Sequence, residues 1–534
     1  MAAVARGPAV VSAGESGILT VMVSVREGHG LAEESLRTVL ADAALPFDLI
    51  YVDILSPPDV AAQVARLCGE HGGRTIRHDR WIAPSAARKQ ALKDVNTRYV
   101  VFIDNDVAVA PGCFAGLVSC AEDTGAALVG PVYLQSGYDG PPTIHMAGGR
   151  LERLGGDDGP LTYEEHLLAA APAEIADTLA RRRVDSLEYH CMLARTDFIR
   201  GEGVISDEVL LAHEHMDVAL RAEAAGFAVW VEPAARITYL GFRPRQLGDL
   251  PFFRRRWDLG ACDASMAAFA RTWPVADEAE FNRSARDFVG RCLDGVSLTM
   301  AAAPTEAMAR SDLAQSRTDL REQAAAAGYA DEHLRALEAG CDFATLLFDG
   351  VYRPDGRPFL SHVIGTASAL VHYRLKFEMV LAGLLHAVYS HRPGWIAEAD
   401  VTAFLSSGGK ADQIVRALPR VKARLSDADR GGAVRADRLS LADAETLCVE
   451  AANEADMRLA GEYRACGRPA VIGEGALALF ADALAYVDLP GLALSAAAPL
   501  GQGPVGQVLG FGAIHGSFRL NAAARRVDPV RSGG

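Results

Sequence analysis

The chain has 534 residues, half of them hydrophobic, and its 68 acidic against 53 basic residues give a formal net charge of −15. A chain of this length holds two or three domains with sizeable cores. The acidic balance argues against broad affinity for nucleic acid or for an anionic membrane surface, although a local basic patch is compatible with it.

The cysteines and the apolar stretches indicate the cellular compartment. The nine cysteines are scattered without a CxxC pair, which indicates reduced thiols and no zinc ribbon. No stretch is apolar for the length of a membrane span, and the first residues lack the apolar core of a signal peptide. We therefore expect a cytoplasmic protein with no integral membrane segment, and attachment to a membrane through a partner remains open.

Strand and helix patterns alternate in the first hundred residues. Apolar, β-branched runs at 18–25 and 47–52 predict strands, and each is followed by helical apolar spacing, at 31–40 and 60–67. A third strand is expected near 74–77. Strands that alternate with short helices predict an α/β fold with a doubly wound, mostly parallel sheet.

The next predicted strand, 100–103, is followed by two aspartates with one residue between them, Asp104 and Asp106. Open α/β sheets bind ligands at the carboxyl ends of their strands. Two carboxylates there can hold Mg²⁺ or Mn²⁺ together with phosphate oxygens of a substrate. The alternative is an ordinary polar turn, because Asp and Asn are common turn residues.

The residues around these aspartates resemble the family 2 glycosyltransferases, which have the nucleotide-sugar-binding GT-A fold. Asp53 and Ser56, after the second strand, are similar to the family's nucleoside-facing residues. Arg88, in a helix that starts behind Pro84, is similar to the arginine of its helix motif. Asp104 and Asp106 resemble its DxD signature, so the resemblance implies that both hold Mn²⁺ or Mg²⁺. It also implies that four residues bind the donor: Asp53, Ser56, Arg88 and Asp104.

The resemblance spans about residues 17–275. The run 144–149, Ile-His-Met-Ala-Gly-Gly, is similar to the family's His-rich segment, whereas 155–183 carries no motif that we can interpret. Many family members have a later histidine that completes the metal shell, and none stands at that place here. The metal shell can be completed instead by one of three other histidines, His190, His213 or His215. Alternatively, the aspartates and the phosphates hold the metal alone.

A second polar cluster contains Glu214, His215 and Asp217. In the family the residue after this Glu is commonly the aspartate that deprotonates the acceptor hydroxyl, and here it is His215. A histidine with a near-neutral pKa can carry out the same proton transfer, and Glu214 can orient it or act itself, with Asp217 in support. The alternative is an amphipathic helix whose acidic first turn is favoured by the helix dipole.

The second half of the chain is predicted to be helical. His362, His386 and His391 lie in segments that resemble the HD superfamily, whose histidines and aspartates bind metal for phosphohydrolase chemistry. Ala387 stands where the superfamily has the aspartate of its His-Asp pair. The loss of that carboxylate favours a degenerate domain used for binding or assembly over a hydrolase with the three histidines as ligands.

The sequence thus predicts a GT-A domain followed by an all-α HD-like domain. We expect transfer of a sugar from a nucleotide-diphospho-sugar, in particular a UDP-sugar, to a hydroxyl acceptor, with inversion implied only by the resemblance. The alternatives are a non-catalytic nucleotide-sugar-binding or scaffold protein and an HD-type phosphohydrolase fused to a nucleotide-binding domain. The second domain could also join copies of the chain into a homo-oligomer. The predicted divisions are an N-terminal tail at 1–16, the GT-A domain at 17–297, a helical linker at 298–334, the HD-like domain at 335–500 and a flexible tail at 501–534.

Overall fold

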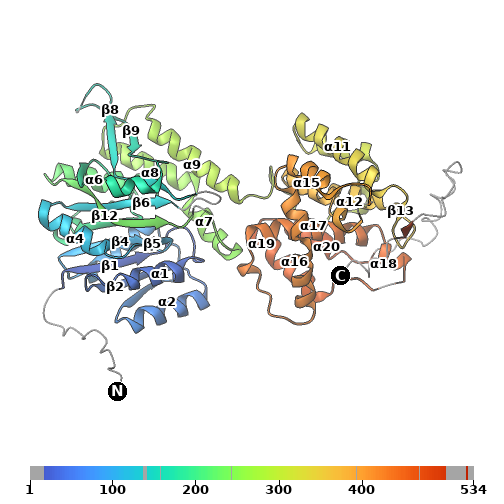
Figure 1. Ribbon diagram of the computed structural model, residues 1–534, viewed down its shortest axis with the longest axis horizontal. Helices are drawn as coiled ribbons and strands as arrows, with labels where there is room; N and C mark the ends of the chain where they lie inside the picture. Colours follow the sequence, from blue (N-terminus) through green and yellow to red (C-terminus); the bar gives the residue numbers. More distant parts are fainter. Residues whose placement is uncertain are drawn as a thin grey trace, which may run out of the picture. The chain divides into compact units, whose positions relative to one another are not determined.

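A computed structural model describes residues 17–135, 141–156, 158–241, 243–391, 394–467, 469–500 and 525–526. The chain divides into two compact units, of which the first ends at Gly295 and the second begins at Val296 and includes residues 246–248 (Figure 1). The predicted tails lie outside the described residues, apart from the two-residue strand β14, Arg525–Arg526.

The first unit is built on one ten-stranded sheet in the order β10-β12-β6-β11-β4-β1-β2-β3, with β5 paired to β12 and β7 to β6. A separate hairpin joins β8 and β9. The bounds are β1 Leu19–Ser24, β2 Asp48–Ile54, β3 Arg74–His78, β4 Tyr99–Asp104, β5 Val107–Val109, β6 Leu128–Gln135, β7 Thr143–Met146, β8 Gly149–Arg153, β9 Leu161–His166, β10 Arg182–Val184, β11 Cys191–Arg195 and β12 Val229–Tyr239.

The sheet is mixed but mostly parallel, as predicted: β1, β2, β3, β4, β6 and β12 run in one direction, because β4 and β6 are both antiparallel to β11 and β12 is parallel to β6. The strands β4, β1, β2 and β3 run parallel, as the alternating pattern predicts. However, β11 lies between β4 and β6 and is antiparallel to both. The predicted strands at 18–25, 47–52, 74–77 and 100–103 are confirmed as β1 to β4. Every residue of β1 and β4 is buried, which explains why both read as continuous apolar runs.

Helices surround this sheet (Figure 1). The helices predicted at 31–40, at 60–67 and behind Pro84 are confirmed as α1, α2 and α3. The bounds are α1 Ala32–Ala41, α2 Pro58–Glu70, α3 Pro84–Ala91, α4 Cys113–Thr124, α5 Thr196–Ile199, α6 Glu214–Ala224, α7 Leu250–Arg256, α8 Leu259–Thr272 and α9 Glu280–Val296, with short 3-10 turns at Leu92–Asp94 and Ala173–Thr178. A further 3-10 turn, Leu247–Asp249, begins in the second unit and ends in the first.

The glycine pair at 148–149 sets the path of the chain beside the sheet. Gly148 has a φ of 82°, which favours glycine. A Cβ on Gly149 would lie 2.0 Å from Ser186 Oγ, and the Gly149 amide donates to the Ser186 carbonyl at 2.9 Å. Only a residue without a side chain permits this approach, which fixes the β8–β9 hairpin next to the segment that precedes β11.

The second unit is helical, as predicted. The helix α17 lies at the centre of its core: residues 443–458 are all buried, and the helix contacts α12, α16 and α20. The bounds are α10 Arg317–Ala326, α11 Asp331–Phe348, β13 Val351–Tyr352, α12 Phe359–His372, α13 Phe377–Leu384, α14 Val388–His391, α15 Glu398–Ser407, α16 Ala411–Asp429, α17 Leu441–Leu459, α18 Glu462–Ala465, α19 Glu474–Tyr486 and α20 Pro490–Ala496, with 3-10 turns at Arg310–Asp312 and Ala436–Arg438.

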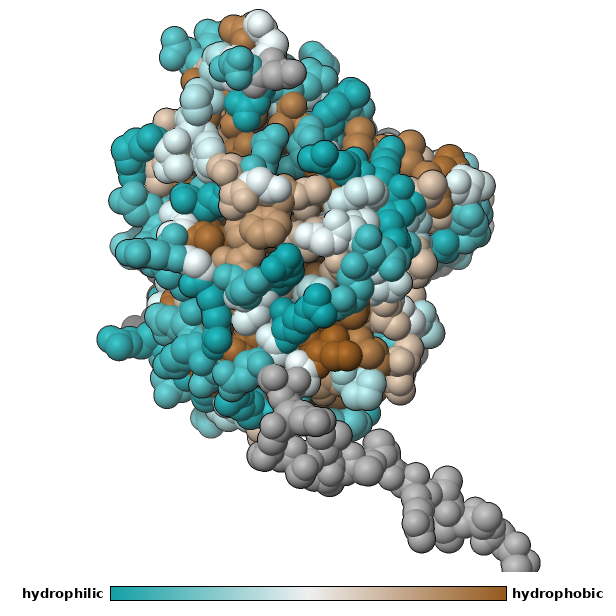
Figure 2. Space-filling model, turned by 90° about the vertical axis from the view of Figure 1, so that its left-hand side faces the viewer, coloured by the Kyte–Doolittle hydropathy of each residue, from teal (hydrophilic) through white to brown (hydrophobic). Residues whose placement is uncertain are grey.

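The segment 298–334, for which a helical connection is predicted, is helical only at Arg310–Asp312, in α10 and at the start of α11. It packs on the second unit: the Met308 amide donates to the hydroxyl oxygen of Tyr373, and the Ala314 amide to that of Ser368. Among the described residues no helix is both long and apolar enough to cross a membrane. Figure 2 shows one face of the molecule, on which hydrophilic residues predominate and hydrophobic ones form small, separate patches.

Candidate active site

Asp104, the last residue of β4, is fully buried beside two arginines and a histidine. Arg88 of α3 donates to its Oδ1, while His190 Nδ1 lies 2.9 Å and Arg26 Nε 3.3 Å from its Oδ2. Burial alone would raise the pKa of Asp104, but the charges of Arg26 and Arg88 outweigh it and hold the pKa below its usual value. Asp104 is therefore a carboxylate whose charge the protein itself balances.

Asp106 lies two residues farther on in a different environment. It is buried, and neither carboxylate oxygen has a hydrogen-bond partner among the residues that the structure describes. Burial, followed by the charges of Asp104 and Glu27, raises the pKa of Asp106 well above its usual value. A carboxylate in such a place is costly to ionise unless a cation joins it.

The donor set around Asp106 fits a hard divalent cation. Asp104, Asp106 and His190 each offer one ligand atom, and these atoms lie within 4.8 Å of one another. Because Asp104 already binds two arginines, Asp106 is the carboxylate with unused ligand oxygens. Mg²⁺ and Mn²⁺ take one or two carboxylates and complete their shell with water and phosphate oxygens. The orphaned oxygens of Asp106 and the imidazole of His190 match that requirement.

Asn105, between the two aspartates, fastens the loop after β1 over the end of β4. Its Nδ2 donates to the Gly28 carbonyl at 2.8 Å, and its Oδ1 accepts from the Arg26 amide at 3.1 Å. A small pocket of about 20 Å³ lies beside this loop. It is lined by Glu27, Gly28, Gly30, Leu31, Asp106, Gly241, Arg243, Pro244, Arg245 and Asp249.

The predicted nucleoside-facing residues form a pair of their own at the end of β2. Asp53 accepts from the Ser56 amide at 3.2 Å and is ion-paired with Arg77. The Ser56 hydroxyl is buried and has no hydrogen-bond partner among the described residues. Arg88 is fully buried, donates to Ser24 Oγ at 3.0 Å and bonds Asp104, so in this structure it positions Asp104.

The helix α6 begins with the second predicted cluster and is held from both sides. Glu214 Oε1 lies 3.3 Å from Arg26 Nη1, which links α6 to the residues around Asp104. Asp217 is buried and accepts from Arg221 Nε at 2.9 Å and from Trp273 Nε1 at 2.8 Å. Both carboxylates are thus engaged by the protein, and Asp217 fixes the orientation of the helix.

His215 is the most exposed of the three predicted catalytic side chains, with 13% of its side-chain surface accessible, and its Nε2 lies 3.1 Å from Glu164 Oε2. Burial alone would lower the pKa of His215, but the charges of Glu188 and Glu164 outweigh it and raise the pKa to about 10. The expectation of a near-neutral pKa is therefore wrong for the ligand-free protein, because two buried carboxylates surround the ring and keep it protonated at neutral pH.

Of the three histidines considered as the missing metal ligand, the structure brings His190 to the aspartates. His213 has a φ of 62° at the start of α6, bonds Asn282 and packs against Phe269 and Phe281. His215 is held by Glu164 instead. The placement of His190 just before β11, which is antiparallel to β4, brings it beside the end of β4.

Several residues at this site were missed by sequence reasoning. Glu164 and His166 lie in the segment for which no motif was recognised, and Glu188 lies just before His190. Residues 164 and 166 are two apart on β9 and so share one face of the strand, which is a usable signal once a strand is assigned there. Arg26 follows the first strand directly, but its contacts with Asp104 and Glu214 join residues far apart in the sequence.

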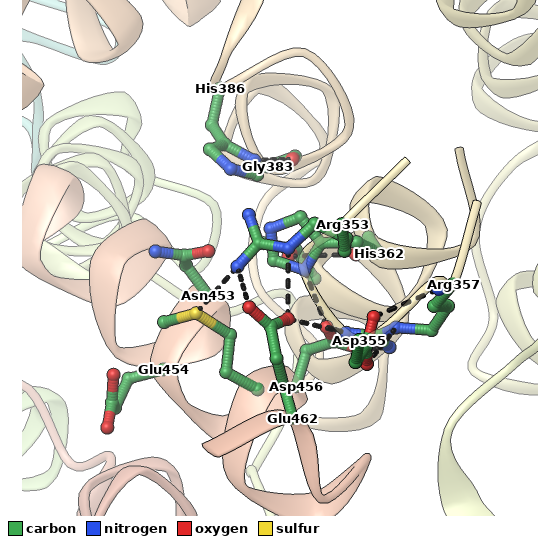
Figure 3. A network of polar contacts seen from close by, with 12 residues as sticks. Arg353, Asp355, Arg357, His362, Gly383, His386, Asn453, Glu454, Asp456 and Glu462 are labelled. Atoms are coloured by element: carbon green, nitrogen blue, oxygen red, sulfur yellow. Dashed lines mark hydrogen bonds and ion pairs between the residues drawn. The ribbon is translucent and has the colours of Figure 1, made fainter. Parts of the chain in front are cut away.

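The second unit contains a separate network of buried charges (Figure 3). Asp456 of α17 accepts two hydrogen bonds from Arg357, at 3.0 and 2.8 Å, and lies 2.6 Å from His362 Nδ1. Arg353 is bound by both carboxylate oxygens of Glu462 at 2.9 and 2.7 Å. His386 lies in the turn after α13 rather than in a helix, and its Nδ1 is 2.8 Å from the Gly383 carbonyl. Guanidinium groups thus balance the carboxylates of this network.

Residues 20–166 match the family model described as glycosyl transferase family 2. This segment contains Asp53, Ser56, Arg88, Asp104 and Asp106 and ends before α6. No curated protein matches the chain.

Three solved structures are similar over part of the chain. One is GalNAc-T7 with UDP, GalNAc and Mn²⁺ (13% identity, 52% of this chain and 55% of that one, TM-score 0.33). Another is S. aureus TarS 1-349 in complex with UDP-GlcNAc (14% identity, 70% of this chain and 91% of that one, TM-score 0.31). A third is the mannosyltransferase PcManGT from Pyrobaculum calidifontis with GDP-Man and Mn²⁺ (15% identity, 53% of this chain and 75% of that one, TM-score 0.33). The chain thus spans little more than half the length of the first of these structures.

The buried ion pair between Arg88 and Asp104 leads to a prediction about stability. Arg88→Met should lower the free energy of unfolding of the first unit by about 3–5 kcal/mol, because it removes one partner of a buried ion pair. Urea unfolding followed by tryptophan fluorescence measures this, since four of the five tryptophans lie before residue 296. Arg37→Met is the matched control: Arg37 pairs with Glu33 on the surface and should cost less than about 1 kcal/mol. Equal losses in both variants would contradict the assigned role of Arg88.

Proposed function

We propose that the first unit is a metal-dependent glycosyltransferase that moves a sugar from a nucleotide-diphospho-sugar, most simply a UDP-sugar, to a hydroxyl acceptor. The observation that carries the proposal is the pair of buried, unpartnered oxygens of Asp106 at the end of β4, inside the segment that matches the glycosyltransferase family model. The charge of Asp104 is balanced by the protein, whereas Asp106 has ligand oxygens to offer.

The donor would bind along the ends of β2, β1 and β4. Asp106 and His190, with Asp104 behind them, would hold Mn²⁺ or Mg²⁺. When bound, such a cation supplies positive charge that stabilises the leaving diphosphate. Arg243 and Arg245 line the pocket beside Asp106 and would contact the phosphate oxygens, for which guanidinium groups are suited. Asp53 and Ser56 would bind the nucleoside.

The acceptor hydroxyl would be activated at the start of α6. Glu214 and Asp217 are engaged by arginines and a tryptophan, which supports His215 as the side chain that meets the acceptor. The ring must first be neutral to accept the hydroxyl proton. Glu164 orients it and Glu214 holds the neighbouring arginine, so both are positioning residues in this proposal. Inversion at the anomeric carbon follows if the hydroxyl attacks directly from the face opposite the diphosphate.

For the second unit we propose a role in binding or assembly rather than metal-dependent hydrolysis. The carboxylate of Asp456, which lies beside His362, is engaged by Arg357 and by His362 itself. Ala387 offers no ligand atom next to His386. These contacts favour an HD-like domain whose metal centre has been replaced by ion pairs.

The metal assignment is tested with Asp106→Asn, which keeps the shape of the side chain. Mn²⁺ with UDP should raise the midpoint of thermal unfolding of the parent, because a ligand that binds only the folded state stabilises it, by about 2.7 kcal/mol at a hundred times its Kd. The variant should show no such rise and should be at least as stable as the parent without ligand, since it removes a buried acid. Asp207→Asn, an exposed carboxylate of the same unit, should behave like the parent. A full Mn²⁺-dependent rise in Asp106→Asn would place the cation elsewhere.

The role of His215 is tested with His215→Asn, which should lower kcat by about 10²–10⁴-fold, the usual contribution of a general base, and leave donor affinity unchanged. Because the neutral ring is required and its pKa is about 10, the parent rate should rise between pH 7 and 10. His215→Asp should abolish that rise. His213→Asn, which keeps a residue that tolerates positive φ, should retain kcat. Parent-like kcat in His215→Asn would transfer the role to Glu214.

A further inference from the structure

Three residues from separate segments meet next to the aspartates. His145 lies on β7, His166 ends β9 and Glu188 precedes β11. Each offers one ligand atom, and these atoms lie within 4.8 Å of one another. The ring centroids of His145 and His190 are 5.8 Å apart, so this group adjoins the one that contains Asp106 but shares no residue with it.

The backbone around the three residues is fixed before any ligand arrives. The Tyr133 hydroxyl donates to the Glu188 carbonyl at 2.9 Å and accepts from the Glu188 amide at 3.2 Å. His166 is paired with Gly149 across the β8–β9 hairpin, and Gly149 is bonded in turn to Ser186. The close approach of Gly149 to Ser186 therefore holds the strand that carries His166 beside the segment that carries Glu188.

The separation of the ligand atoms suits a small transition-metal ion. His166 Nε2 and Glu188 Oε1 are 3.8 Å apart. Bonds of about 2.0–2.2 Å to a tetrahedral ion place two ligand atoms about 3.4 Å apart, so a shift of a few tenths of an ångström would bring these two atoms to that separation.

We propose that His145, His166 and Glu188 form a second divalent-cation site that prefers Zn²⁺ or a similar transition metal. Two imidazoles and one carboxylate are a ligand set that zinc uses where a fourth position stays open for water or a substrate oxygen. Imidazole ligands also separate this site chemically from the carboxylate-rich site at Asp106, which suits Mg²⁺ or Mn²⁺. The proposal does not depend on the transferase function.

The carboxylate of Glu164 places this site next to the start of α6. Its Oε2 is 3.8 Å from His166 Nε2 and 3.1 Å from His215 Nε2, and its Oε1 accepts from the Ser186 hydroxyl at 2.5 Å. The proposed site thus adjoins the start of α6, where the acceptor is expected. A bound ion would bring a further positive charge close to His215.

The test uses the full chain, stripped with a chelator, equilibrated with Zn²⁺ in the presence of excess Mg²⁺ and then analysed for metal content and by calorimetric titration. The parent should bind one Zn²⁺ per chain. His166→Ala and Glu188→Gln should each weaken this binding by more than about 100-fold, since even outer partners of metal ligands contribute 10–100-fold. Substitution by Co²⁺ should give a visible ligand-field absorption in the parent that His166→Ala loses.

Three control variants locate the ion. Asp106→Asn should keep the bound Zn²⁺, because the two sites share no ligand. His386→Ala should keep it too, which excludes a site at His386 of the second unit, and so should His71→Ala, an exposed histidine at the end of α2. Circular dichroism verifies that each variant is folded, and Glu188→Gln preserves the shape of the side chain if His166→Ala proves unstable. The proposal is overturned if the parent binds no Zn²⁺, if both ligand variants bind it like the parent, or if it is lost in Asp106→Asn or His386→Ala.

Discussion

The balance of charge at the end of β4 is the constraint on which the rest of the site depends. Asp104 is buried with Arg26, Arg88 and His190, and these partners come from the loop after β1, from α3 and from the segment before β11. Arg26 reaches on to Glu214 at the start of α6. One buried carboxylate therefore sets the relative positions of the elements that would bind the donor and the acceptor. Because Asp104 takes both arginines, Asp106 is left without a protein partner among the described residues, and this asymmetry turns a pair of similar aspartates into one structural residue and one candidate metal ligand.

A second consequence of buried charge is the clustering of imidazoles and carboxylates beside the start of α6. Glu164 and Glu188 remain ionised although they are buried, since His215 and the neighbouring histidines compensate for their charge. The same carboxylates keep His215 protonated at neutral pH in the ligand-free protein. A cation bound at Glu188 would compete for the same negative charge, so the occupancy of the proposed second site and the protonation of His215 are expected to be linked.

Local patterns in the sequence predict the parts of this structure that depend on local interactions. The strands β1 to β4 and the helices α1 to α3 follow from apolar periodicity, and the position of Asp104 and Asp106 follows from the strand that ends there. Features that depend on distant partners were out of reach. The direction of β11 between β4 and β6 makes the sheet mixed, and no local signal reports it. The raised pKa of His215 requires Glu164 and Glu188, which lie in segments without a recognised motif. In the second unit, the histidine spacing is visible in the sequence, but the pairing of Asp456 with Arg357 is not.

The central claim is that Asp106 and its neighbours bind a nucleotide-diphospho-sugar through a divalent cation. The most direct measurement is the release of nucleoside diphosphate from a panel of UDP-sugars by the full chain, followed with Mn²⁺ present and with Mn²⁺ removed by a chelator. We expect that at least one donor is hydrolysed slowly or transferred, with release of UDP that stops when the metal is removed and resumes when it is restored. Release at the same rate without metal, or no binding and no turnover of any nucleotide-sugar in the presence of Mn²⁺, would contradict it.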